Sequence, residues 1–138
     1  MSGSGAEFAN ANVELLERIS AWASQRPDIL TQLSHAYLVV GRVDDAKEVA
    51  LRAKELVPEA KFAYWNLLNI YVVTNDVENI KLTLEKIFMI NIKQNNFLPG
   101  TDIALTESEA RQLGTLMTQA EQNNQPEIKQ AIEAYFTQ

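Results

Sequence analysis

Apolar residues recur along this chain at the three- and four-residue spacing of amphipathic helices, and no segment predicts a strand. Short polar runs with glycine, proline or asparagine separate these stretches, as expected of turns. Helices are predicted over residues 12–22, 29–40, 43–56, 61–74, 77–90, 106–122 and from 126 onward. Because the connections are short, neighbouring helices should be antiparallel. The chain is therefore predicted to be all-α, an antiparallel helix-pair solenoid of about seven helices with an N-terminal capping helix.

Several predicted helix ends carry a local signal. Pro27 ends the helix before it and can begin the next, because its fixed φ suits the first helical position. Gly41 can adopt the left-handed conformation that caps a helix, and Pro58 stops the third helix. Thr106 and Glu109 have the spacing of a capping box, which predicts the start of the sixth helix.

The organisation of the chain follows from these boundaries. Residues 1–8 resemble a cloning leader and are left out of the predicted fold. The remainder, 9–138, is predicted to be a single domain with five parts: a capping helix 9–25, a helix pair 27–60, a second pair 61–92, an insert 93–105 and a last pair 106–138. The insert is long for a loop between helices. Its apolar residues predict that it packs down: Phe97, Leu98, Ile103 and Leu105.

A recurrent spacing links nine residues of the first pair: Leu30, Leu33, Ser34, Tyr37, Gly41, Ala46, Ala50, Ala53 and Pro58. This segment resembles a unit of the tetratricopeptide-repeat family, although Leu30 stands where that family has tryptophan and Ala50 where it has an aromatic residue. Small residues such as Ala46 let paired helices approach closely. One period of about 34 residues later a weaker match follows: Tyr64, Leu67, Leu68, Tyr71, Ile80, Leu84 and Ile87. There Ile80 replaces an alanine and Ile92 a proline.

The charge of the chain bears on its partners. It has 18 acidic and 12 basic residues, for a net charge of −6. Nucleic-acid binding needs clustered Lys and Arg, which are scattered here, so no nucleic-acid partner is predicted. No apolar run approaches the roughly 20 residues that span a bilayer, so no membrane insertion is predicted. Without cysteine the redox compartment stays open. We favour the cytoplasm, with the periplasm or a soluble domain of an anchored protein as alternatives.

Candidate catalytic chemistry is sparse. His35 is the only histidine, and no serine stands in the Gly-x-Ser-x-Gly context of a nucleophile elbow. Asp44, Asp45 and Glu48 cluster at the start of a predicted helix, where acidic side chains favour the helix dipole, and we prefer that interpretation to a metal site. No glycine-rich phosphate loop is present. The chain is predicted to be no enzyme and to hold neither metal nor cofactor.

The segment 62–73 is apolar almost all round, so a single core-facing stripe does not account for it. The resemblance implies that the first helix of each unit lines a concave, partner-binding groove. The groove positions in this register are Phe62, Trp65, Asn69, Val72 and Val73, with Thr31, His35 and Leu38 one unit earlier, flanked by Asp28 and Val39. The side-chain amides of Asn66 and Asn69 could hold a peptide backbone. Alternatively, the loop 91–105 or the C-terminal pair covers Phe62 and Trp65.

Three functions remain open. The first is an adaptor or scaffold that binds a peptide or helix in the groove, with Trp65 and Phe62 as anchors. The second is a chaperone of secretion or pilus assembly that shields an apolar client segment, since the chain is similar in size to small bacterial domains of this family. The third is self-association through the fourth helix or through Tyr135 and Phe136.

Overall fold

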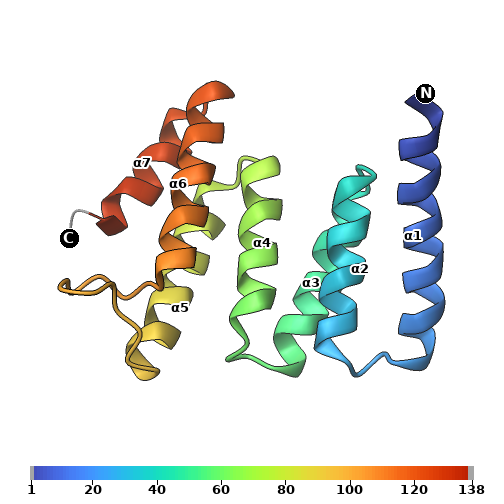
Figure 1. Cartoon of the computed structure of the whole chain (residues 1–138), viewed down its shortest axis with the longest axis horizontal. Helices are drawn as coiled ribbons and strands as arrows, with labels where there is room; N and C mark the ends of the chain where they lie inside the picture. The colour runs from blue at the N-terminus through green and yellow to red at the C-terminus, as the bar shows by residue number, and fades with distance from the viewer. Residues whose placement is uncertain (1, 137–138) are drawn as a thin grey trace. The chain divides into compact units, whose positions relative to one another are not determined.

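A computed structural model describes the backbone of residues 2–136 and the side chains of residues 5–135. Over that range the chain forms seven helices and no strand (Figure 1). They are α1 (Ser2–Trp22), α2 (Pro27–Val39), α3 (Val43–Leu56), α4 (Lys61–Val73), α5 (Val77–Lys93), α6 (Glu107–Gln122) and α7 (Pro126–Phe136). Among these helices, α2 packs against α1 and α3, and α7 packs against α5 and α6. The predicted all-α class is confirmed.

Two helices are longer than the apolar pattern predicts. α1 begins at Ser2, so residues of the segment interpreted as a leader are helical. Extending an existing helix adds one backbone hydrogen bond per residue, which costs far less than starting one. α5 runs three residues past its predicted end and includes Asn91. The bounds of α3 agree with the prediction, and Pro27 occupies the first turn of α2.

Backbone contacts divide the chain into two compact units, Met1–Ile70 and Tyr71–Gln138, with the division inside α4. The first unit contains α1, α2, α3 and most of α4. α2 packs against both α1 and α3. The core between these helices is mostly bulky on α2 and mostly small on α3. Its buried residues are Leu30, Leu33, Ala36 and Tyr37 on α2, and Ala46, Val49, Ala50 and Ala53 on α3. The completely buried alanines allow the close approach of α2 and α3 that their spacing predicts.

Tyr37 links α2 to α1 and to the turn before α3. Its hydroxyl donates a 2.6 Å hydrogen bond to a carboxylate oxygen of Glu17 on α1. The guanidinium of Arg42, which follows α2, lies 4.5 Å from the centre of the Tyr37 ring. This tyrosine therefore combines core packing with a polar link across helices.

The same turn closes two helices 34 positions apart. Gly41 after α2 and Asn75 after α4 both have positive φ, 83° and 55°. In the first turn the amide of Arg42 donates to the Tyr37 carbonyl oxygen at 2.8 Å, and in the second Asp76 donates to Tyr71 at 2.9 Å. These bonds are the six-to-one bonds of a Schellman motif. The same bond and a positive φ also occur after α5 at Asn95 and after α6 at Asn124, so this turn is a common way in which the described helices end.

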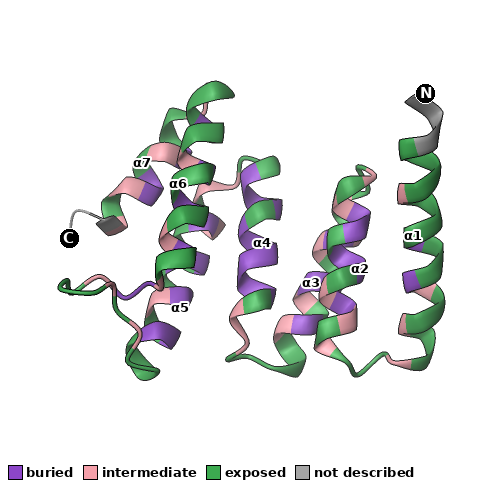
Figure 2. Cartoon of the chain, viewed as in Figure 1, coloured by how far each residue is buried: buried purple, intermediate pink, exposed green. Residues whose placement is uncertain are grey.

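The second unit contains the end of α4, then α5, α6 and α7. α7 packs against both α5 and α6. The rings of Phe88 and Tyr135 stack with their centroids 4.9 Å apart, and the Tyr135 hydroxyl donates to the Lys81 carbonyl oxygen at 3.0 Å. Figure 2 shows buried and exposed residues interspersed along the ribbons of the helices of this unit. The residues that form its core are Ile80, Leu84, Ile87, Ile90, Leu105, Leu113, Leu116, Ala120, Ile128, Ala131 and Ile132.

Asn91 anchors the segment between α5 and α6. Its completely buried side-chain amide donates 2.9 Å hydrogen bonds to the Ala104 carbonyl oxygen and to Oε1 of Glu109. The same Glu109 oxygen accepts from the Thr106 amide at 3.0 Å, and Thr106 Oγ1 accepts from the Glu109 amide at 3.2 Å. The predicted capping box is confirmed, and Asn91 ties it to α5.

The predicted packing of the insert is only partly correct. Leu105 is fully buried, whereas Phe97 keeps 39% of its surface exposed. Leu98 and Ile103 are half-buried, and the Leu98 amide donates to the Ile103 carbonyl oxygen at 2.9 Å across the turn at Gly100. The end next to α6 packs down, because Asn91 holds it there.

Candidate protein-binding face

α2 and α4 run in the same direction within the first unit (Figure 1). They are joined by Asn66, whose side-chain amide donates a 2.6 Å hydrogen bond to the hydroxyl oxygen of Ser34. The Ser34 hydroxyl in turn donates to the Ala46 carbonyl oxygen at 2.6 Å, and both side chains are buried. These two consecutive hydrogen bonds therefore connect α4, α2 and α3, and we call them the Ser34–Asn66 joint. They fix which sides of α2 and α4 face each other and which sides remain on the surface.

Five of the predicted partner-binding residues border this joint on one side. At 100° per residue, Thr31, Leu38 and His35 follow Ser34 around α2, while Phe62 and Asn69 lie next to Asn66 around α4 in the opposite sense. Because the two helices are parallel, these side chains share one side of the pair. We call this surface the α2–α4 face, defined by Thr31, His35, Leu38, Phe62 and Asn69.

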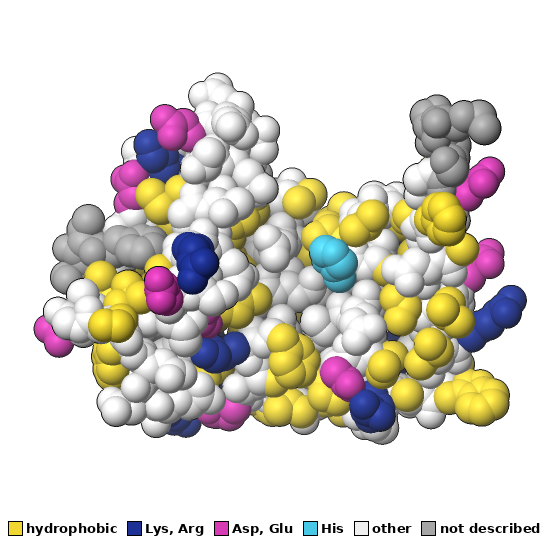
Figure 3. All heavy atoms as spheres, in the orientation of Figure 1, with side chains coloured by type: hydrophobic (Ala, Val, Ile, Leu, Met, Phe, Trp, Pro, Cys, Tyr) yellow, Lys and Arg dark blue, Asp and Glu magenta, His cyan; other side chains and the backbone are white. Residues whose placement is uncertain are grey.

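The α2–α4 face is open to solvent in part. Phe62 is 43% exposed, His35 and Asn69 are exposed, and Thr31 and Leu38 are half-buried. Val39, next along α2, is 62% exposed. Figure 3 shows hydrophobic and polar side chains mixed on the visible side of the molecule. The face offers an aromatic ring and polar groups together, as binding sites for peptides do.

Two of the predicted groove residues are buried, contrary to a role as open contacts. Trp65 keeps only 9% of its surface exposed and Val72 only 6%. The residue pattern could not show this, because α4 is apolar on nearly all sides and several sides of it are covered. Val73 is 59% exposed, and with Val72 it belongs to the second unit. The core positions predicted for Tyr64, Leu67, Leu68 and Tyr71 are all buried, as expected.

The two asparagines of α4, Asn66 and Asn69, differ in their accessibility to a peptide. The Asn66 side-chain amide is buried and hydrogen-bonded to Ser34, so it is not accessible to a bound peptide. The Asn69 amide donates to the Trp65 carbonyl oxygen of its own helix at 3.0 Å, and its side chain remains exposed. Asn69 alone retains the predicted capacity to contact a backbone. The alternative that the loop 91–105 or the C-terminal pair covers Phe62 and Trp65 stays a prediction.

Other candidate chemistry lies apart from this face. Asp45 forms a 2.9 Å ion pair with Arg42 and lies with Asp44 in the first turn of α3, where acidic side chains favour the helix dipole. Among the residues that the structure describes, no group of three His, Asp or Glu side chains is placed to hold a metal ion. The Phe136 side chain, expected at a self-association surface, lies outside the described side chains, and Tyr135 is half-buried against Phe88. The side-chain oxygen of Thr31 is buried without a hydrogen-bond partner.

Comparison with known proteins assigns no family. Within the described part of the chain, no helix has both the length and the hydrophobicity to cross a membrane. No protein-family model matches the sequence, and neither a curated protein nor a solved structure is significantly similar to it.

Proposed function

We propose that this chain is a tetratricopeptide-repeat-like interaction module that binds a peptide segment of another protein on the α2–α4 face. The repeat-like character is supported by the small buried residues between α2 and α3. The first helix pair is also linked to α4, because the Tyr64 hydroxyl donates a 2.6 Å hydrogen bond to the Pro58 carbonyl oxygen between α3 and α4. Such modules stack helix pairs and present the surface of the first helix of each pair.

The observation that carries the proposal is the exposure of Phe62 beside the Ser34–Asn66 joint. An aromatic side chain on a rigid helix gives a large contact area at little entropic cost. His35 and Asn69 flank it with groups that can donate or accept hydrogen bonds. The expected ligand is a short segment with an apolar side chain for Phe62 and a backbone or polar group for Asn69.

The proposal is tested with peptides selected from a random displayed library against the wild-type protein. Their affinities are then measured by titration calorimetry on three proteins: wild type, Phe62→Ala and Leu82→Ala. Phe62→Ala should weaken binding by about tenfold or more, the loss typical of an aromatic anchor. Leu82 is the matched control, because it is 56% exposed on α5 in the other unit.

Amide chemical shifts of the labelled protein give an independent check. Bound peptide should move the signals of His35, Leu38 and Asn69 and leave those of α7 unchanged. Selected peptides that bind Phe62→Ala as tightly as wild type, or a library that yields no binder, would contradict the proposal.

A further inference from the structure

α1 carries an apolar stripe that stays partly exposed in the described chain. Leu15 is 56% exposed, Ile19 38% and Trp22 94%. An open hollow of about 550 Å³ lies beside them, lined by Arg18, Ile19, Ala21, Trp22 and Ala23. Figure 3 shows hydrophobic side chains spread over the visible surface of α1. A contiguous exposed apolar patch of this kind is a candidate interaction site.

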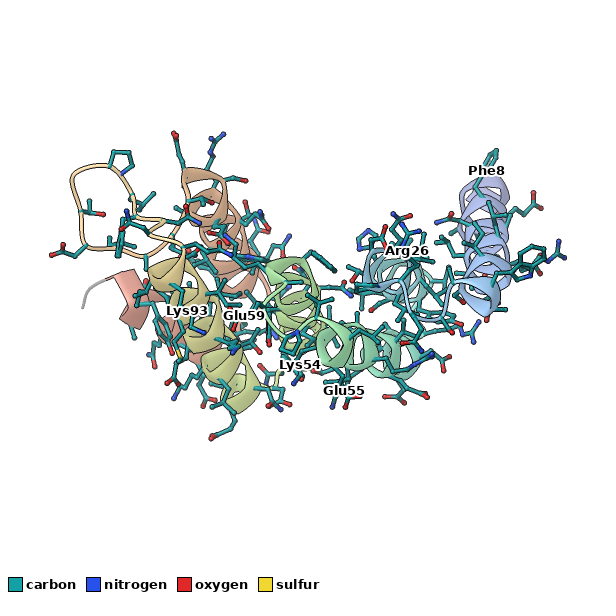
Figure 4. The ribbon with its side chains drawn as sticks, turned by 90° about the horizontal axis from the view of Figure 1, so that it is seen from below. Phe8, Arg26, Lys54, Glu55, Glu59 and Lys93 are labelled. Atoms are coloured by element: carbon teal, nitrogen blue, oxygen red, sulfur yellow. The ribbon has the colours of Figure 1, made fainter. Side chains whose placement is uncertain are left out.

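The opposite side of α1 is already committed to the core. Val13 and Leu16 are buried, and Glu17 accepts the hydrogen bond from Tyr37 of α2. Rotating α1 to bury Trp22 would expose these two residues and break that bond. The stripe is therefore a second, independent face of the helix. Phe8 also projects outward from α1 (Figure 4).

The spacing of the stripe indicates what kind of partner fits. Asn12, Leu15, Ile19 and Trp22 follow one another at intervals of three, four and three residues. This is the a and d spacing of a coiled-coil seam, which packs best against another helix with the same spacing. The most direct source of such a helix is α1 of a second molecule, since an isologous two-fold contact uses one patch twice.

We propose that two copies of this protein associate through α1, with the two helices antiparallel. In an antiparallel pair each d residue meets an a residue of the partner. Leu15 then packs against the partner's Ile19, and Trp22 lies beside the partner's Asn12. The indole N–H of Trp22 is a donor without an acceptor in the stripe of its own helix, and the Asn12 side-chain oxygen can accept it.

Charge complementarity supports the same register. Glu14 and Arg18 are both exposed and lie on the same flank of the stripe. In a two-fold antiparallel pair the same flanks meet, so Arg18 comes within reach of the partner's Glu14, and the contact occurs twice. In a parallel pair this flank would instead face the partner's opposite flank, so Glu14 and Arg18 would not meet. Charged residues that flank a seam commonly decide its orientation in this way.

The area involved predicts a weak dimer. Leu15, Ile19 and Trp22 expose roughly 400 Å² of side chain per copy, so the pair buries about 1,000 Å² once the flanks are included. That is near the lower limit for a specific interface. Association should therefore depend visibly on protein concentration, and occupied and free α1 should both be populated in solution.

Sedimentation velocity from low-micromolar to several-hundred-micromolar protein tests this proposal. The average mass should rise from 15.5 kDa towards twice that value. Leu15→Glu should remain at the monomer mass while its circular dichroism stays helical, because more than half of the Leu15 surface faces solvent. Leu82→Glu, with the same exposure on α5, should associate like wild type. A mass of 15.5 kDa at every concentration, or association of Leu15→Glu equal to wild type, would overturn the proposal.

Charge reversal tests the register separately. Glu14→Arg should weaken association because it faces the partner's Arg18, and the double variant Glu14→Arg with Arg18→Glu should restore it. Failure of the double variant to associate would exclude the antiparallel register. Phe62→Ala should associate like wild type, so failure of the peptide-binding proposal leaves this one intact, and the converse also holds.

Discussion

Asn66 donates a 2.6 Å hydrogen bond to the hydroxyl of Ser34, which itself donates to the Ala46 carbonyl oxygen at the same distance. This buried chain connects α4, α2 and α3. Removing the Asn66 amide leaves a cavity and takes a partner from Ser34, so Asn66→Ala should lower the free energy of unfolding by about 1–3 kcal/mol. The measurement is urea denaturation followed by circular dichroism.

Asn69→Ala serves as the control for that experiment. Its side chain is exposed and bonded within its own helix, so the expected change is within about 0.5 kcal/mol. Ser34→Ala combined with Asn66→Ala should cost less than the two single losses together, because both break the same bond. Equal effects at Asn66 and Asn69 would contradict the assigned bond.

A second prediction concerns the link from Asn91 to the start of α6. Asn91→Ala removes two buried hydrogen bonds and leaves the Ala104 carbonyl and the Glu109 carboxylate with fewer donors. The expected loss is about 2 kcal/mol or more. Hydrogen exchange should quicken at the amides of Thr106 and Glu109, while Gln112→Ala on the exposed side of α6 should leave both protected. Unchanged hydrogen exchange of the Thr106 and Glu109 amides in Asn91→Ala would mean that the capping box does not depend on the hydrogen bonds from Asn91.

A third prediction concerns alkaline pH. Burial, together with the hydrogen bond to the Glu17 carboxylate, raises the pKa of Tyr37 to about 12, above the usual value near 10. A raised pKa in the folded state stabilises the fold below the unfolded value, and the contribution is lost as the pH rises through the folded value. The free energy of unfolding should therefore fall as the pH rises from about 10 to about 12.

Denaturation at a series of pH values, with phenolate absorbance, measures this effect. Burial also raises the pKa of Tyr64, Tyr71 and Tyr135, so Tyr37→Phe should reduce the slope without abolishing it. If Tyr37→Phe retains the full wild-type slope, Tyr37 does not contribute to the alkaline loss.

A fourth prediction uses the unpartnered hydroxyl of Thr31. Its oxygen is buried and makes no hydrogen bond, so it lost water on folding without compensation. Thr31→Val keeps the shape of the side chain and should raise the free energy of unfolding by about 1 kcal/mol. Thr115→Val gives the comparison, because the Thr115 hydroxyl is exposed and donates to the Arg111 carbonyl oxygen at 3.1 Å. No gain for Thr31→Val over Thr115→Val would refute this explanation.

A fifth prediction compares the effect on stability of replacing two glycines, Gly41 and Gly114, by alanine. At both Gly41 and Gly114 an added Cβ meets open space, so contacts do not distinguish them. Gly41 has φ of 83°, and Gly41→Ala should destabilise the protein by about 1 kcal/mol through backbone strain. Gly114 lies inside α6, where Gly114→Ala should stabilise it by roughly 0.5–1 kcal/mol. Thermal denaturation should show shifts of opposite sign, and shifts of the same sign would disprove the strain argument.

Much of the local structure of this protein was predictable from its residues. The bounds of α3 and the capping box of Thr106 and Glu109 both follow from the sequence. So does the turn at Gly41. These features depend on the apolar pattern of one segment and on hydrogen bonds between residues a few positions apart, so neighbouring residues suffice to specify them.

Tertiary packing decided the features that matter for the binding face. Trp65 is buried although its register placed it beside Phe62 on an open surface, because an all-round apolar helix does not reveal which of its sides is covered. Asn66 and Asn91 look like surface amides, and Asn91 like the start of a loop. Each is buried because its hydrogen-bond partners come from other segments, 32 residues away for Asn66 and 13 and 18 residues away for Asn91. Burial of a polar group depends on partners that only the folded chain brings together.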